Sequence, residues 1–216
     1  MKEQRVRITF EKTTAMRYTG HLDLRRAWER TFRRSGLPLA YSQGYTPRPQ
    51  FNFAAPLPLG FLSTYELADF WLEEHQDLKT IHQKLTDAVP PGISLREVVD
   101  IPHLHRDKLP TLVQAADYEI KLSANLQDVE DQINRLRKAD KIIRQRRGDT
   151  YNLTNLLLAL KRLADSREGK QRLWMKMSLL PGATGRPDEV VDEMGGDVYS
   201  SDIIRTMIHL KKTTQD

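Results

Sequence analysis

The sequence predicts an α+β protein made of two similar units in tandem. The chain has 216 residues, which suits two domains of about 100 residues each. Segments in which apolar and polar residues alternate are interspersed with segments of helical spacing, and these patterns are typical of strands and helices. In the first hundred residues their order is strand, helix, strand, strand, helix, strand, which is the ferredoxin-like (split βαβ) pattern. We therefore expect a ferredoxin-like domain at 1–102, a linker at 103–116 and a second ferredoxin-like domain at 117–216.

The first unit should begin with a strand at 5–10, where alternating residues give one basic and one apolar face. A helix should follow at 22–35, because its apolar residues have helical spacing and Gly36 and Pro38 then end it. The apolar side of this helix consists of Leu24, Ala27, Trp28, Thr31 and Phe32. The remaining elements are expected to be strands near 51–53, 67–72 and 93–101, and a helix that Asp77 caps.

The second unit should repeat this order of elements and carry one inserted helix. We place that helix at 153–164, because several leucines recur there with helical spacing: Leu153, Leu156, Leu157, Leu160 and Leu163. The other expected elements are strands near 118–122, 141–147, 172–179 and 203–210, a helix after Asn125 and a short helix at 187–194.

The absence of cysteine excludes several kinds of chemistry on this chain, among them disulfides, thiolate metal sites, cysteine nucleophiles and iron–sulfur clusters. We expect no cofactor and no metal site. No window approaches the roughly 18 consecutive apolar residues of a transmembrane helix, and no apolar run typical of a secretory signal follows the N-terminus. The protein is therefore expected to be cytoplasmic and to make no contact with membranes.

Positive charge is concentrated at the start of the chain. Residues 1–60 contain 11 Lys and Arg against 4 acidic residues, whereas the whole chain has a net charge of only +5. Such a basic segment favours a polyanionic partner, although a solvated face with acids nearby in the fold would explain it equally well.

Two features of this segment predict nucleic-acid binding. On the helix at 22–35, Arg26, Arg30 and Arg33 fall within about 60° of one another, and Arg34 lies close by. The loop that follows has tyrosines suited to base stacking and an arginine between two prolines. The alternatives are a solvated helix face and a rigid connector. The predicted nucleic-acid-binding residues are Arg5, Arg7, Arg26, Arg30, Arg33, Arg34, Tyr41, Tyr45 and Arg48.

His21 is the one candidate for a catalytic role. It could act as a general base or donate to a phosphate, but it opens a helix together with Asp23, whose charge the helix dipole favours, so a structural role is the simpler interpretation. His103 and His105 could form a metal pair, but no third ligand is identifiable. A second basic segment in the other half of the chain contains Arg137, Lys138, Lys141, Arg144, Arg146 and Arg147.

Three segments carry a resemblance to a known family: YTGHLDL at 18–24, FRRSGLPLAYS at 32–42 and GYTPRP at 44–49. The chain resembles the radical-SAM-linked proteins, a bacterial domain of unknown function found beside, or fused to, radical SAM enzymes. The motif residues of this resemblance are His21, Asp23, Ser42, Gly44, Pro47 and Pro49. The resemblance implies a radical SAM partner, and because this chain has no cysteine, that partner must supply the iron–sulfur cluster.

The leading functional hypothesis is a non-catalytic RNA-binding accessory that works with a radical SAM enzyme. One alternative is a metal-independent endoribonuclease that uses His21 and resembles CRISPR repeat-processing proteins, an analogy of fold pattern alone. The other alternative is a protein-interaction adapter for the radical SAM partner. RNA and a radical SAM enzyme are thus the expected partners.

Overall fold

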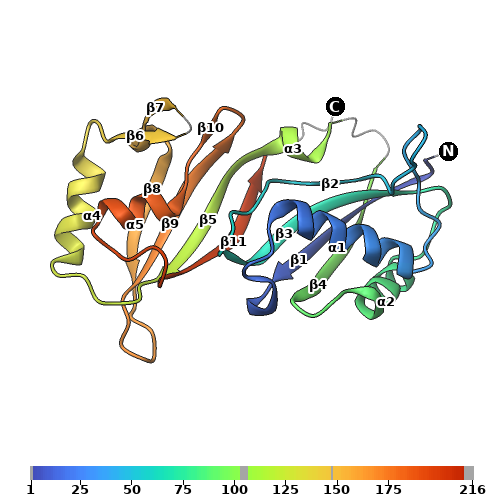
Figure 1. Ribbon diagram of the computed structural model, residues 1–216, viewed down its shortest axis with the longest axis horizontal. Coiled ribbons are helices and arrows are strands. Elements are labelled where there is room, and N and C mark those ends of the chain that lie inside the picture. Colours follow the sequence, from blue (N-terminus) through green and yellow to red (C-terminus); the bar gives the residue numbers. More distant parts are fainter. Residues whose placement is uncertain (1, 103–106, 147, 212–216) are drawn as a thin grey trace. The chain divides into compact units, whose positions relative to one another are not determined.

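The computed structural model describes residues 2–102, 107–146 and 148–211 (Figure 1). The chain forms two compact units, Met1–Val113 and Gln114–Asp216, which we call unit 1 and unit 2. The described residues form a mixed α+β fold with five α-helices and mostly antiparallel strands. None of the helices within those residues is long and apolar enough to cross a membrane.

Unit 1 follows the order of elements that its sequence predicts, with short helices added near both ends. The elements are β1 (Gln4–Lys12), η1 (Thr14–Met16), α1 (His21–Arg34), β2 (Phe51–Phe53), β3 (Leu62–Leu72), α2 (Leu78–Ala88), β4 (Ile93–Ile101) and α3 (Leu109–Leu112). The four strands form an antiparallel sheet in the order β2–β3–β1–β4.

The core of unit 1 lies between this sheet and helices α1 and α2, which cover the same face of the sheet (Figure 1). Alternate residues of β1 point into this core, and Val6, Ile8 and Phe10 are all completely buried. Trp28 of α1 packs against Phe10 at 4.8 Å between ring centroids, in an edge-to-face arrangement. The buried side of α1 consists of Leu24, Trp28, Thr31 and Phe32, which confirms the predicted helix face.

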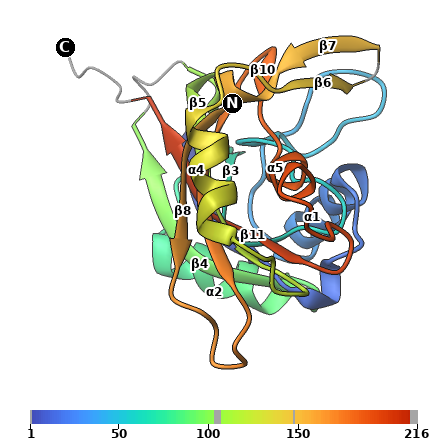
Figure 2. The same cartoon turned by 90° about the vertical axis from the view of Figure 1, so that its left-hand side faces the viewer.

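Unit 2 contains two more α-helices and the remaining described strands. Its elements are β5 (Val113–Lys121, whose first residue ends unit 1), α4 (Val129–Lys138), β6 (Ile143–Arg146), β7 (Asp149–Asn152), η2 (Leu153–Asn155), β8 (Leu157–Leu163), β9 (Arg172–Leu180), β10 (Ala183–Thr184), α5 (Pro187–Glu193) and β11 (Asp202–Leu210). Four of these strands are neighbours in the order β8–β9–β5–β11, and α4 lies alongside β8 (Figure 2).

The helix expected at 153–164 is not formed, and this prediction is wrong. After the single turn η2, the chain extends as β8 and pairs antiparallel with β9 from Leu157 opposite Met177 to Leu163 opposite Arg172. Leu160 is buried while the next residue, Lys161, is exposed, as expected of a strand with one covered face. The strand register shifts between Leu157 and Ala159, where Leu158 is about half exposed. Between α4 and η2 the chain forms β6 and β7, which pair antiparallel with each other.

Part of the expected linker at 103–116 is regular structure. Residues 109–112 form α3, in which Leu109 is completely buried, and β5 begins at Val113. The expected pair His103 and His105 lies outside the described residues.

Candidate functional site

Helix α1 presents four arginines to solvent on the side opposite its buried residues. It begins at His21 with Asp23 in its first turn and ends at Arg34, with Gly36 just beyond it at a φ of +63°. We call its exposed arginines the arginine row, namely Arg26, Arg30, Arg33 and Arg34. The structure thus confirms that the helix has one apolar and one basic side.

Two members of the arginine row, Arg26 and Arg34, make polar contacts with other residues of unit 1. Arg26 Nη1 lies 3.2 Å from Asp23 Oδ1 in an exposed pair, and Arg34 Nη2 donates to the carbonyl of Ala88 at 2.6 Å. The other two members make no hydrogen bond or ion pair with any residue that the structure describes. Exposed pairs contribute little stability, so the Asp23 contact leaves Arg26 available to an anion.

Arg5 and Arg7 do not form the exposed basic face that the alternating pattern of β1 predicts. Arg5 is 6% exposed and Arg7 is 15% exposed. Both donate to the completely buried Asp69 of β3, Arg5 Nη2 at 2.6 Å and Arg7 Nε at 2.7 Å. Asp69 lies directly opposite Arg7 in the sheet, so the strand register brings the charges together. Arg5 and Arg7 of β1 therefore serve mainly to neutralise a buried carboxylate.

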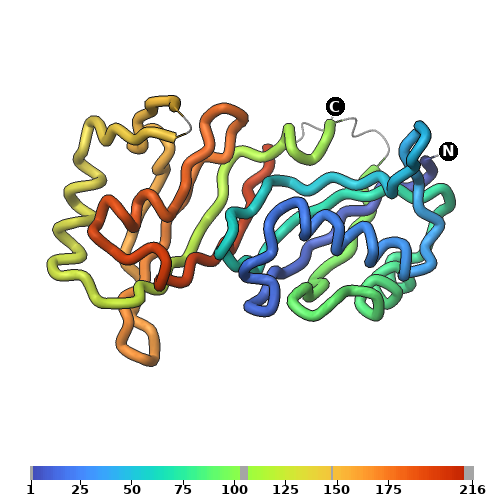
Figure 3. Tube along the Cα trace, in the orientation of Figure 1, coloured from blue at the N-terminus to red at the C-terminus, as the bar shows by residue number. Residues whose placement is uncertain are grey.

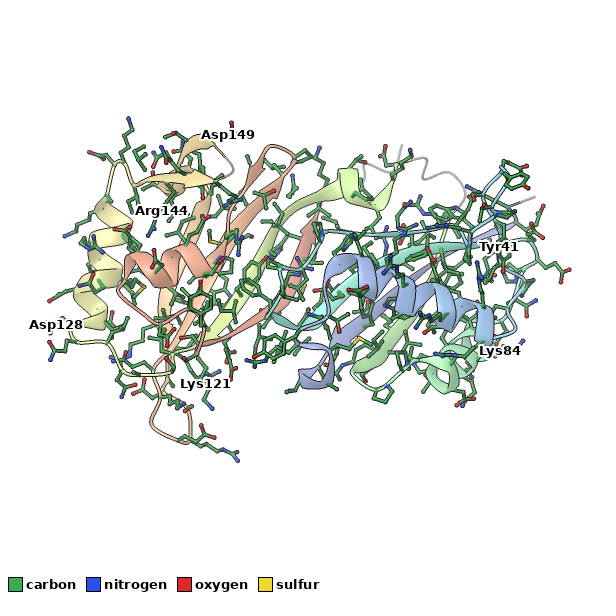
Figure 4. The ribbon with its side chains drawn as sticks, in the orientation of Figure 1. Tyr41, Lys84, Lys121, Asp128, Arg144 and Asp149 are labelled. Atoms are coloured by element: carbon green, nitrogen blue, oxygen red, sulfur yellow. The ribbon has the colours of Figure 1, made fainter. Side chains whose placement is uncertain are left out.

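The loop between α1 and β2 closes on itself (Figure 3). The Ser42 amide donates to the carbonyl of Arg48 at 2.9 Å, and the Arg48 amide donates to Ser42 Oγ at 3.1 Å. Gly44 has a φ of +131°, a conformation that other residues rarely adopt. At the loop Tyr45 is fully exposed and Tyr41, labelled in Figure 4, is 37% exposed. Of the motif prolines that flank Arg48, Pro47 is exposed and Pro49 is buried.

A pocket of about 610 Å³ in unit 1 is lined by five cationic side chains and no acidic one. We call it the cationic pocket. Its lining consists of Lys2, Arg5, Arg25, Ser42, Arg48, Pro49, Gln50, Phe51, Asn52, Trp71 and Lys108. Of the predicted nucleic-acid-binding residues it includes only Arg5 and Arg48, whereas the arginine row and both loop tyrosines lie outside the lining.

Aromatic rings hold several of the pocket cations in place. Lys2 Nζ lies 4.7 Å from the centroid of the Trp71 ring, and Arg5 Cζ lies 5.5 Å from the same centroid. Arg25 Cζ lies 4.4 Å from the centroid of the buried Phe51 ring. These are favourable cation–π distances.

The pocket contains residues that the sequence analysis did not select, namely Lys2, Arg25, Asn52, Trp71 and Lys108. Arg5 and Trp71 face each other only through the β1–β3 register. Lys108 comes from a segment more than one hundred positions away from Lys2. No spacing in the sequence connects these residues. The basic count of residues 1–60 includes Lys2 and Arg25, but it gives no signal for Asn52, Trp71 or Lys108.

Two arginines of the second basic segment, Arg144 and Arg146, are neutralised within unit 2. Arg144 lies 2.6 Å from Asp192 and 2.8 Å from Glu193, and Arg146 lies 2.8 Å from Glu189. Burial lowers the pKa of Arg144, but the hydrogen bond to Asp192 and the charges of α5 raise it above its ordinary value.

These pairs fasten the β6–β7 hairpin to α5, near the Arg144 label in Figure 4. Arg137 Nε donates to the carbonyl of Leu160 at 2.9 Å. Lys138 and Lys141 remain exposed, and Arg147 lies outside the described residues. Arg144 and Arg146 are therefore parts of a structural ion-pair cluster and are not free to bind a polyanion.

His21 is half-buried at the start of α1. Its ring packs edge-to-face on Phe53, with 5.6 Å between the ring centroids. His82 is half-buried in α2, with its Nδ1 3.4 Å from Thr86 Oγ1. In the part of the chain that the structure describes, no group of three or more His, Cys, Asp or Glu residues is arranged to hold a metal ion.

These features define an α+β protein whose first unit carries an exposed arginine row and a cationic pocket. The chain belongs to the family described as "Uncharacterized protein conserved in bacteria (DUF2344)", whose model matches residues 5–186. The matched range includes the arginine row and every pocket residue except Lys2. No match to a curated protein was found.

Proposed function

We propose that this protein is a non-catalytic RNA-binding accessory. The observation that carries the proposal is the arginine row, which lies on the exposed side of a helix whose other side is completely packed. Guanidinium groups bind phosphates through two parallel hydrogen bonds and stay charged at any physiological pH. A row of them on one helix face matches the repeated negative charge of an RNA backbone.

The loop between α1 and β2 supports the same proposal. Tyr45 exposes its whole ring and precedes the exposed Arg48 by three residues in the same loop. Stacking on an aromatic ring beside a cation is a common way to hold unpaired bases. The glycine at 44 and the two flanking prolines give the loop a defined backbone on which this ring is displayed.

The proposed partner is a radical SAM enzyme. This part of the proposal is supported by the resemblance of the 18–24, 32–42 and 44–49 segments to radical-SAM-linked proteins. The chain contains no cysteine, so the three cysteines that hold the cluster would come from the partner. In this proposal the accessory protein binds the RNA and the radical SAM enzyme modifies it. Both proteins would act in the cytoplasm.

We further infer that both units are variants of a ferredoxin-like unit. In unit 1 the sheet order β2–β3–β1–β4 places the second, third, first and fourth strands side by side. Unit 2 has the corresponding order β8–β9–β5–β11, with the β6–β7 hairpin as its insertion. Helices α4 and α5 occupy the chain positions in unit 2 that α1 and α2 occupy in unit 1.

Replacement of Arg26, Arg30 and Arg33 together by glutamine should weaken RNA binding and flatten its salt dependence. Each phosphate of a single strand that is no longer neutralised lowers the slope of log K against log salt by about 0.7, so three phosphates correspond to about 2. Fluorescence anisotropy with a short labelled RNA, repeated at several salt concentrations, measures this slope.

A matched control removes the same charge elsewhere. Lys138, Lys141 and Arg167 are exposed in unit 2, and their triple replacement by glutamine should leave the slope unchanged. If both triple variants flattened the slope equally, binding would depend on overall charge and the arginine row would have no special role. An unchanged slope in the folded α1 variant would contradict the proposal.

The protein alone is expected to leave labelled RNA intact in the presence of excess chelator. Cleavage without metal needs a base, an acid and a group that stabilises the charged transition state, all within a few ångströms. His21 packs on an apolar ring, and the other described histidines of unit 1 lie after β3 (His75) and within α2 (His82). Gel analysis of the RNA after incubation with wild-type protein and with His21→Ala tests this. Cleavage by the wild type that disappears in the variant would establish the endoribonuclease alternative.

A further inference from the structure

The cationic pocket is separate from the arginine row and is built from five parts of unit 1. The N-terminus provides Lys2, β1 provides Arg5, α1 provides Arg25, the loop provides Arg48 and the segment before α3 provides Lys108. Arg25 projects toward Phe51, away from the exposed side of α1 that carries the arginine row. The pocket and the row can therefore be altered independently.

The positive charge of the pocket is only partly compensated. Arg5 shares Asp69 with Arg7, and Arg25 Nε lies 3.6 Å from Glu29. The side chains of Lys2, Arg48 and Lys108 make no hydrogen bond or ion pair with the described residues, and all three residues are exposed. Cations that converge without acids between them favour an anion with more than one charge.

The polar groups of the pocket suit a ligand with a polar body next to its charge. Ser42, Gln50 and Asn52 add a hydroxyl and two amides to the lining. Gln50 donates from its Nε2 to the carbonyl of Tyr41 at 2.8 Å, and its side-chain oxygen can still accept a hydrogen bond. The faces of Trp71 and Phe51 already hold cations, so these rings orient positive charge and do not serve as open stacking platforms.

We infer that the cationic pocket binds a phosphate monoester, carried by the end of an RNA strand or by a free mononucleotide. A phosphate monoester carries about −1.5 to −2 charges near pH 7, whereas each phosphate within a strand carries one. Several cations around one cavity therefore favour the monoester. The volume of about 610 Å³ falls within the range of small-ligand sites. The RNA-end form of this inference rests on the proposed RNA-binding function, and the mononucleotide form does not.

The test compares short single-stranded RNAs of one sequence that carry a 5′ phosphate, a 3′ phosphate or hydroxyl groups at both ends, with adenosine monophosphate as a separate ligand. The wild type should bind at least one phosphorylated RNA about tenfold more tightly than the hydroxyl-ended RNA, because the terminal phosphate adds charge-assisted hydrogen bonds. Combined Arg48→Gln and Lys108→Gln should abolish that preference. Both side chains are exposed, so the variant should fold, and circular dichroism checks this.

The variant with Arg26, Arg30 and Arg33 replaced by glutamine separates this inference from the proposed function. It should weaken the binding of all three RNAs alike and keep the preference for the phosphorylated end. If it binds RNA normally while the preference persists, the proposed role of the arginine row fails and the pocket inference stands. Binding of adenosine monophosphate alone, abolished by Arg48→Gln and Lys108→Gln, would support the pocket as a mononucleotide site. Equal binding of all RNAs by the wild type, together with no binding of adenosine monophosphate, would overturn the inference.

Discussion

Replacement of Trp28 by alanine should lower the free energy of unfolding by about 3–5 kcal/mol, the usual cost of deleting a large buried aromatic side chain. Trp28 is completely buried, and its ring lies 4.8 Å from that of Phe10 and 5.3 Å from that of Phe32. Alanine would leave a cavity between α1 and the sheet, and the packing contacts that the indole makes there would be lost. Denaturant unfolding followed by circular dichroism measures the loss.

Trp28→Phe is the matched control for this prediction. The indole Nε1 of Trp28 is buried without a hydrogen-bond partner among the described residues, so phenylalanine forfeits no such bond. A change from one aromatic residue to a smaller one should cost about 1–2 kcal/mol, well below the alanine variant. A loss below about 1 kcal/mol for Trp28→Ala would mean that this side of α1 does not carry the core.

Asp69→Ala should lower the free energy of unfolding by about 3–5 kcal/mol, because it leaves two largely buried guanidinium groups without their shared carboxylate. Arg5 and Arg7 both donate to Asp69, which is itself completely buried. The variant should also disturb the cationic pocket, since Arg5 lines it. Unfolding in urea measures the loss of stability. Hydrogen exchange of the β1 and β3 amides reports the disturbance near Arg5 and Trp71, two residues that line the pocket.

Asp23→Ala provides the comparison with an exposed pair. Asp23 and Arg26 have side chains about two-thirds exposed, and such pairs contribute less than about 1 kcal/mol. If both aspartate variants lost similar stability, the buried triad of Asp69 with its two arginines would not have the energetic role inferred from its geometry.

Helix α1 and the strands of unit 1 could be predicted because their patterns are local. The spacing of Leu24, Trp28 and Phe32 defines a helix side wherever the helix packs, and the alternation in 5–10 defines a strand. The same reasoning failed at 153–164, where leucines spaced three or four apart occur in β8. There the hydrogen bonds that the neighbouring strand β9 provides outweighed the helical spacing.

In the candidate site, too, the features set by local spacing could be predicted from the sequence, and those set by contacts between distant segments could not. The exposure of Arg30 and Arg33 follows from helical periodicity, so these residues could be chosen from the sequence. The burial of Arg5 and Arg7 could not, because their carboxylate, Asp69, lies more than sixty positions away and is brought opposite them by strand register. The cationic pocket depends on the same kind of contact, since Lys2, Trp71 and Lys108 meet only when the sheet and the segment before α3 are assembled. Periodicity reports which side of an element is apolar, whereas pairing between distant segments determines which charges neutralise one another and which remain open to a ligand.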